Sequence, residues 1–151
     1  PSNAQVYEEN ARRYLAELEE LHRYSKEQIA AIPSPRRVLV TAHDAFRYFG
    51  EAYDIEVRGI LGLSTESEAS VRDINELARF LASRGVKAVF VESTISPKNV
   101  QALIEGCRAL GHEVRIGGEL FGDAMGAEGT PQGTYTGMVR HNVDTIVRSL
   151  K

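Results

Sequence analysis

The sequence contains few or none of several features, and each shortage excludes a class of site or partner. Cys107 is the only cysteine in 151 residues, so neither an internal disulfide nor a site built from several thiolates is possible. No apolar run approaches the roughly 20 residues of a membrane span, and no signal peptide is visible. A net charge of −3 without a basic cluster in the sequence argues against a nucleic-acid partner.

Motifs of common enzyme classes are also missing. The first predicted strand is followed by residues 41–45, which contain no G-x-G-x-x-G pattern and no phosphate-binding loop, so dinucleotide binding is disfavoured. No G-x-S-x-G motif is present to carry a hydrolase nucleophile. Glu92 stands where a receiver domain would carry its phosphorylated aspartate, so that interpretation fits poorly too.

The chain instead shows one long helical pattern followed by alternating strands and helices. Apolar residues spaced mostly three or four apart predict a helix over residues 4–32, about 40 Å long, which Pro33 and Pro35 end. Four strands then alternate with helices, which predicts an α/β fold: a four-stranded parallel sheet, order 2-1-3-4, with helices on both faces. We therefore expect a long linking helix at residues 1–33 and an α/β lobe at residues 34–151. Because the helix is longer than its lobe requires, a second body is expected at its far end.

Candidate metal ligands lie at the carboxyl ends of the predicted strands, where ligands of parallel sheets gather. His43 follows the first strand, and Asp123 lies in the glycine-rich stretch 117–129, which is predicted to be a loop after the fourth strand. Imidazole and carboxylate together suit a divalent ion such as zinc or manganese. Glu92, at the end of the third strand, and Glu119 are predicted to support the ligands. The alternative is a solvated surface connection without a metal.

Two ligands do not complete a metal site, because zinc usually takes four. The other histidines are poor candidates for the missing ligands. His22 is expected on the long helix, His112 at the opposite end of the sheet, and His141 in the last helix, where it is expected to pack or hydrogen-bond. The remaining ligands must therefore come from elsewhere.

Several stretches of the chain resemble the TroA-like metal-binding solute receptors of bacterial ABC importers: residues 38–46, 62–68, 90–93, 117–126 and 134–142. The resemblance covers essentially the whole chain. Receptors of this family have two α/β lobes joined by one long helix, with the metal in the cleft between them. The chain is similar to the linking helix and the C-terminal lobe. The resemblance implies that His43 and Asp123 are two of four ligands, and that two further histidines come from an N-terminal lobe with no counterpart before Pro1.

The function implied by this resemblance is not enzymatic. It is that of a fragment of an extracytoplasmic receptor, periplasmic or lipid-anchored at the outer face of the cell membrane. Such a receptor binds zinc, manganese or iron for delivery to an ABC import permease, and this fragment would hold half of the site. The uncovered helix also favours self-association of the fragment. Two other functions stay open: a metal-dependent hydrolase that uses His43, Asp123 and Glu92, and a surface adhesin module on the same scaffold.

Overall fold

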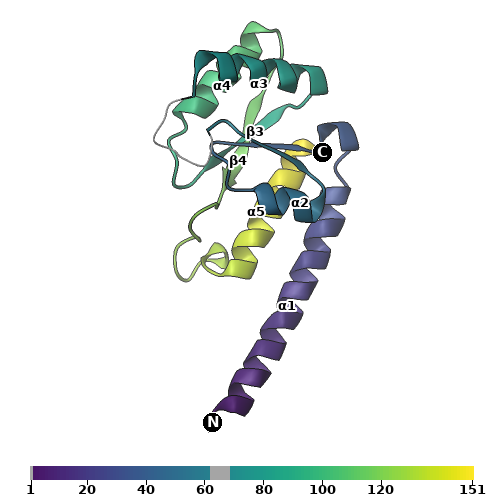
Figure 1. Cartoon of the computed structure of the whole chain (residues 1–151), viewed down its shortest axis with the longest axis vertical. Coiled ribbons are helices and arrows are strands. Elements are labelled where there is room, and N and C mark those ends of the chain that lie inside the picture. The colour runs from purple at the N-terminus through teal and green to yellow at the C-terminus, as the bar shows by residue number, and fades with distance from the viewer. Residues whose placement is uncertain (1, 62–68) are drawn as a thin grey trace.

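The computed structural model describes residues 2–61 and 69–151, in which one long helix is followed by alternating strands and helices (Figure 1). The stretch 62–68, which carries part of the family resemblance, lies outside the described residues. The helices are α1 (Ala4–Ala30), α2 (Arg47–Tyr53), α3 (Val71–Arg84), α4 (Lys98–Ala109) and α5 (Tyr135–Leu150). The strands are β1 (Val38–Thr41), β2 (Glu56–Gly59), β3 (Ala88–Glu92) and β4 (Arg115–Leu120), and η1 (Ser34–Arg36) and η2 (Pro131–Gly133) are short 3-10 turns.

The strands confirm the predicted fold class. β1 pairs in parallel with β2, and β3 pairs in parallel with β4. β1 also lies beside β3, so the spatial order is 2-1-3-4, although the backbone ladders of the described residues form two separate pairs. Helices α3 and α4 pack together on one side of the strands, and α1, α2 and α5 lie on the other (Figure 1).

Burial along the strands explains why this arrangement is stable. All four residues of β1 are buried, as are Ala88, Val89 and Phe90 of β3, so these central strands are covered on both faces as in other α/β folds. Cys107 packs on the inner side of α4 with 0% exposure, which confirms that it acts as a small apolar residue. Its burial raises the pKa of the thiol, so little reactive thiolate is present at neutral pH.

β4 is longer than the sequence predicted. The predicted loop begins at residue 117, but the strand continues through Gly117 and Gly118 to Leu120, with a shift of register opposite Val89 and Phe90. A side chain at Gly117 would come within 2.8 Å of both the Phe90 ring and the Ser149 side chain. The two glycines are therefore required because α5 packs closely against β4. They do not end the strand.

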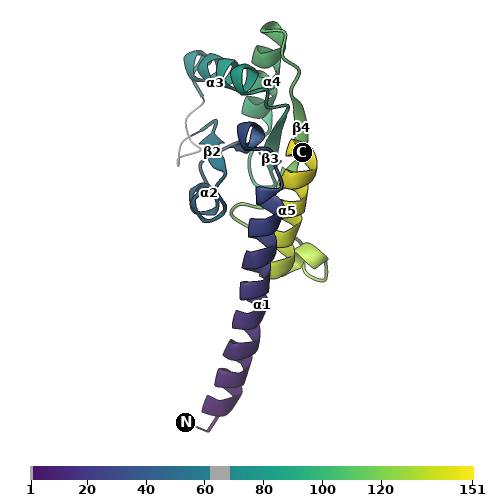
Figure 2. The same ribbon diagram turned by 90° about the vertical axis from the view of Figure 1, so that its right-hand side faces the viewer.

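Helix α1 extends well beyond the lobe. Its C-terminal part lies beside α5, whereas its N-terminal part has no neighbouring element in either view (Figures 1 and 2). Leu21, Ser25 and Ile29 are its buried residues, and the helix ends at Ala30, close to the predicted end. In the described part of the chain, no helix is both long enough and apolar enough to cross a membrane.

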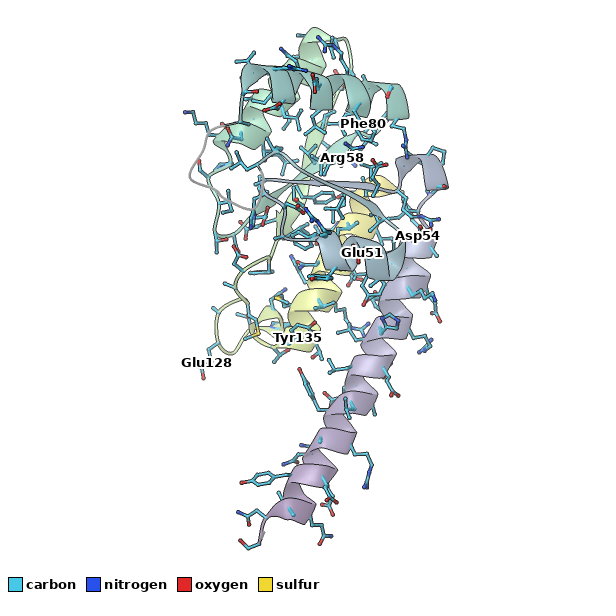
Figure 3. The ribbon with its side chains drawn as sticks, viewed as in Figure 1. Glu51, Asp54, Arg58, Phe80, Glu128 and Tyr135 are labelled. Carbon is cyan, nitrogen blue, oxygen red and sulfur yellow. The ribbon has the colours of Figure 1, made fainter. Side chains whose placement is uncertain are left out.

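Contacts between side chains attach the outer elements to this framework. Figure 3 shows Arg58 of β2 beneath Phe80 of α3, where its guanidinium carbon lies 4.6 Å from the ring centroid. Tyr24 of α1 donates its hydroxyl to Asp144 of α5, and the guanidinium of Arg140 lies 4.1 Å from the Tyr24 ring centroid. The hydrogen bond to Asp144 is the main cause of a raised pKa of Tyr24.

The Tyr24 contact predicts how stability depends on alkaline pH. Because the pKa of Tyr24 is raised in the folded chain, its contribution is fully present below the ordinary tyrosine value of about 10 and is lost as pH rises through the folded value. Replacing Tyr24 with phenylalanine should lower the free energy of unfolding by about 0.5–1 kcal/mol at neutral pH. The loss should shrink in urea titrations at about pH 11. Tyr48→Phe, at a position 86% exposed, is the control. It should leave the free energy of unfolding unchanged both at neutral pH and at about pH 11.

Candidate metal centre

The main chain around His43 is held in a tight turn directly after β1. The carbonyl oxygen of His43 accepts hydrogen bonds from the Thr41 hydroxyl at 2.8 Å and from the Ala45 amide at 3.0 Å. Its own amide donates to Oε1 of Glu92 at 3.0 Å. The ends of β1 and β3 are thus joined through one carboxylate, and the position of the imidazole is fixed relative to both strands.

The other carboxylate oxygen of Glu92 faces the ring of His43. Nδ1 of His43 lies 2.8 Å from Oε2 of Glu92, and the two side chains are 7% and 0% exposed. The pair is close but poorly aligned as a hydrogen bond, and neither atom has another partner among the described residues. A carboxylate next to Nδ1 favours the tautomer with its proton there, which leaves the lone pair of Nε2 free to bind a metal.

Asp123 approaches His43 from the opposite side of the ring. Nε2 of His43 lies 3.5 Å from Oδ2 of Asp123, whose side chain is 59% exposed. The chain reaches this position through Gly122, where a side chain would come within 2.8 Å of Oε2 of Glu92. The segment therefore runs directly against the buried pair, and His43 stands between a buried carboxylate and an exposed one.

The segment that carries Asp123 is anchored to α5 by Asn142. The side-chain oxygen of Asn142 accepts from the Phe121 amide at 3.0 Å, and its side-chain nitrogen donates to the Phe121 carbonyl at 2.9 Å. Asn142 is 4% exposed, so these bonds are sheltered from water. Both polar backbone groups of Phe121 are thus fixed two residues before Asp123.

His141 supports the same segment. Its Nε2 lies 3.1 Å from the carbonyl oxygen of Glu119, and its ring contacts the Phe121 ring at a centroid distance of 5.3 Å. This confirms that His141 packs and hydrogen-bonds. Asn142 was missed by the sequence analysis, although an asparagine at a buried position of a helix is a signal that its amide needs partners.

The structure brings together three of the four predicted site residues. His43, Glu92 and Asp123 form one group, whereas Glu119 lies within β4 with its side chain exposed, and among the described residues only its backbone carbonyl contacts the supporting histidine. His22 and His112 lie elsewhere and contact Tyr53 and the Val86 carbonyl. In residues 2–61 and 69–151, no three His, Cys, Asp or Glu side chains are placed to hold a metal by themselves. His43 and Asp123 offer two donor atoms, Nε2 and Oδ2, that lie 3.5 Å apart.

Comparisons with known proteins agree on one family. The model of the family described as zinc-uptake complex component A, periplasmic, matches residues 1–149. The chain is 50% identical over its full length to the manganese-binding lipoprotein MntA of Bacillus subtilis, covering 49% of that protein. It is 51% identical to the zinc-binding protein TroA of Treponema pallidum, again covering 49% of it with 99% of the chain.

Solved structures give the same result. The structure of the periplasmic zinc-binding protein TroA from Treponema pallidum superposes with a TM-score of 0.94, covering 99% of this chain and 54% of that one. A manganese-bound periplasmic metal-binding protein from Candidatus Liberibacter asiaticus, 25% identical, superposes with a TM-score of 0.86 over 100% of this chain and 54% of that one. The chain thus spans about half the length of the relatives that it matches.

Proposed function

Because the chain belongs to the family described as zinc-uptake complex component A, periplasmic, we propose that His43 and Asp123 supply half of a site that binds zinc or manganese as cargo. The family consists of zinc- and manganese-binding substrate-binding proteins of ABC transporters, and the chain corresponds to part of such a protein. The names of the matched relatives describe metal binding and transport, in agreement with the expectation that the chain is not an enzyme.

The observation that carries this proposal is the spacing of the two donor atoms. Nε2 of His43 and Oδ2 of Asp123 are 3.5 Å apart. If an ion were bound to both atoms at about 2.1 Å, the angle between these two bonds would be about 113°, close to the tetrahedral value. The carboxylate of Glu92 behind the imidazole then acts as the outer partner that orients a metal-binding histidine.

The remaining ligands come from outside this half. We assign residues 1–33 to a linking helix and residues 34–151 to the metal-binding lobe, and we place two further histidine ligands in an N-terminal lobe. The free part of α1 supports this division, because Val6, Tyr7, Tyr14 and Leu15 are exposed there and would be covered by a second lobe. Iron remains within the range of ions that such a donor set accepts.

The location and partner follow from the same assignment. Relatives of the chain are named as periplasmic proteins or lipoproteins. We place the protein that contains this chain outside the cytoplasmic membrane, where it delivers its metal to an ABC import permease. We also propose that copies of the isolated chain associate with one another through the exposed face of α1.

Metal titration of this chain beside the intact protein tests the proposal. Isothermal titration calorimetry with Zn²⁺ and Mn²⁺ should show weak binding to the chain and tighter binding, by at least about 100-fold, to the intact protein, because two added ligands complete the coordination. Elemental analysis of the intact protein as purified should show one transition-metal ion per molecule. Equal affinities for chain and intact protein, or an intact protein without metal, would contradict the proposal.

A further inference from the structure

A second polar region lies at the other end of the strands. It is a hollow of about 750 Å³ whose lining includes Lys87, which immediately precedes β3, and Arg115, the first residue of β4. Glu92 and Leu120 close the same two strands at the end where His43 lies. The hollow is therefore separated from the metal centre by the length of the strands.

The lining of this hollow is strongly positive, although the whole chain carries a net charge of −3. Among the described residues of the lining, the only carboxylate side chain is that of Glu113. Its cationic side chains come from η1, α4, β4, α5 and the residues just before β3 and just after α5: Arg36, Lys87, Arg108, Arg115, Arg148 and Lys151. The sequence shows no basic cluster because these residues are separated along the chain and meet only in the fold.

The cations of the hollow differ from several arginines elsewhere in the described chain that form ion pairs with carboxylates. These paired arginines are Arg23, Arg37, Arg47, Arg58, Arg72 and Arg84. Among the residues that the structure describes, no carboxylate lies within ion-pair distance of a cation of the hollow. Several like charges held together without counter-charges produce a positive potential that attracts anions.

Helix dipoles account for only part of this cluster. Arg108 and Arg148 lie in the last turns of α4 and α5, where a cation stabilises the negative end of a helix. Arg36, Lys87 and Arg115 lie outside these two helices, so this explanation does not extend to them.

The walls of the hollow are held in place by bonds that do not use the cations. Nε2 of His112 lies 2.7 Å from the carbonyl oxygen of Val86, which fixes the segment between α4 and β4. The Ser149 hydroxyl donates to the Gly117 carbonyl at 2.7 Å, which fixes the end of α5 against β4. Ile104 and Val114 add apolar lining. The hollow therefore exists before any ligand arrives, and its charged groups are left to face that ligand.

We propose that this hollow binds a ligand carrying more than one phosphate group. Guanidinium groups match the geometry of phosphate oxygens and bind them through paired hydrogen bonds, and the volume lies within the range of small-molecule sites. One phosphate would leave most of the cations unneutralised. The described residues of the lining include no Phe, Tyr or Trp on which bases could stack, so the hollow does not suit single-stranded nucleic acid. The phosphates belong either to a soluble polyphosphate or to a phospholipid headgroup.

The first experiment uses inorganic tripolyphosphate as the probe. Calorimetry on the unmodified chain should show saturable binding that weakens steeply with salt, because binding a polyanion neutralises several charges at once. Arg108→Glu combined with Arg115→Glu should weaken binding by at least about 10-fold. The matched control, Arg12→Glu with Arg79→Glu, makes the same change of charge at exposed positions outside the hollow and should bind as the unmodified chain does.

A second experiment separates the two sources of phosphate. Sedimentation with vesicles of phosphatidylcholine containing cardiolipin is compared with vesicles of phosphatidylcholine alone, for the same variants. Tripolyphosphate binding without vesicle binding assigns the hollow to a soluble ligand, and hollow-dependent binding to cardiolipin vesicles assigns it to a headgroup. Either result supports the site. Binding of neither probe, or equal weakening by the hollow variant and the control variant, overturns it.

Discussion

The intact protein is expected to lose more than about 100-fold in affinity for zinc or manganese when His43 is replaced by alanine. In the proposed half-site, His43 supplies the one nitrogen donor. Its backbone amide donates to Oε1 of Glu92, and Oε2 of the same carboxylate lies 2.8 Å from Nδ1 of its ring. Loss of an outer partner alone typically costs 10- to 100-fold in metal affinity, so loss of the ligand itself should exceed that range. Asp123→Ala should have a comparable effect because it removes the opposing oxygen donor.

Glu119→Ala provides the matched control for these variants. It removes a carboxylate from the same part of the chain as Asp123, but the Glu119 side chain is exposed and lies outside the His43 group. Calorimetry with Zn²⁺ and Mn²⁺ should give an affinity within about twofold of the unmodified protein, as is usual for a surface substitution away from such features. Unchanged affinities in both ligand variants, or a loss in the control as large as theirs, would contradict the assignment of the ligands.

Replacing Asn142 with leucine is expected to lower the free energy of unfolding by about 2–4 kcal/mol. Asn142 bonds to both polar backbone groups of Phe121 inside the protein, and leucine leaves both without a partner. Each unsatisfied buried group costs about 1–3 kcal/mol. Urea unfolding of this chain, followed by circular dichroism, measures the change as a lower midpoint. The same variant should weaken metal binding, since Asp123 lies two residues after the released segment.

Asn75→Leu is the control for this second prediction. Asn75 lies on α3 and is exposed, so the same substitution there leaves no buried group unpaired. Its free energy of unfolding should stay within about ±0.5 kcal/mol of that of the unmodified chain, as is usual for surface positions. If both leucine variants unfold at the same urea concentration, the Asn142 bonds contribute nothing to the stability of the fold.

The parts of the fold predicted correctly are those with a clear periodic pattern. The three- and four-residue spacing located α1, and the alternation of strands and helices predicted the parallel strands and their order. The length of β4 was missed because Gly117 and Gly118 resemble the start of a loop. Glycine is needed at these positions because α5 packs closely against the strand. A side chain placed at Gly118 would come within 2.4 Å of Thr145. That contact joins distant parts of the chain and leaves no local signal.

The candidate site was predictable to the extent that strand ends define it. The rule that ligands gather at the carboxyl ends of parallel strands brought His43, Glu92 and Asp123 into one region, as the structure does. It also suggested Glu119, which failed to join the group because β4 continues past it. The two hydrogen bonds between Asn142 and Phe121 depend on the packing of α5 against β4. No spacing in the sequence indicates this packing.

The unequal burial of the two sides of His43 has a consequence for the time course of metal exchange. Glu92 and His43 are enclosed, whereas Asp123 faces solvent from the end of a segment. If the two residues bind the metal as proposed, the bond to Asp123 would be the first that water could replace, while the imidazole would still hold the ion. Most affinity differences between related complexes lie in the dissociation rate, so the exposed carboxylate would be the donor whose replacement most changes the residence time of the ion. The enclosed imidazole would be the donor that an arriving ion finds already in position.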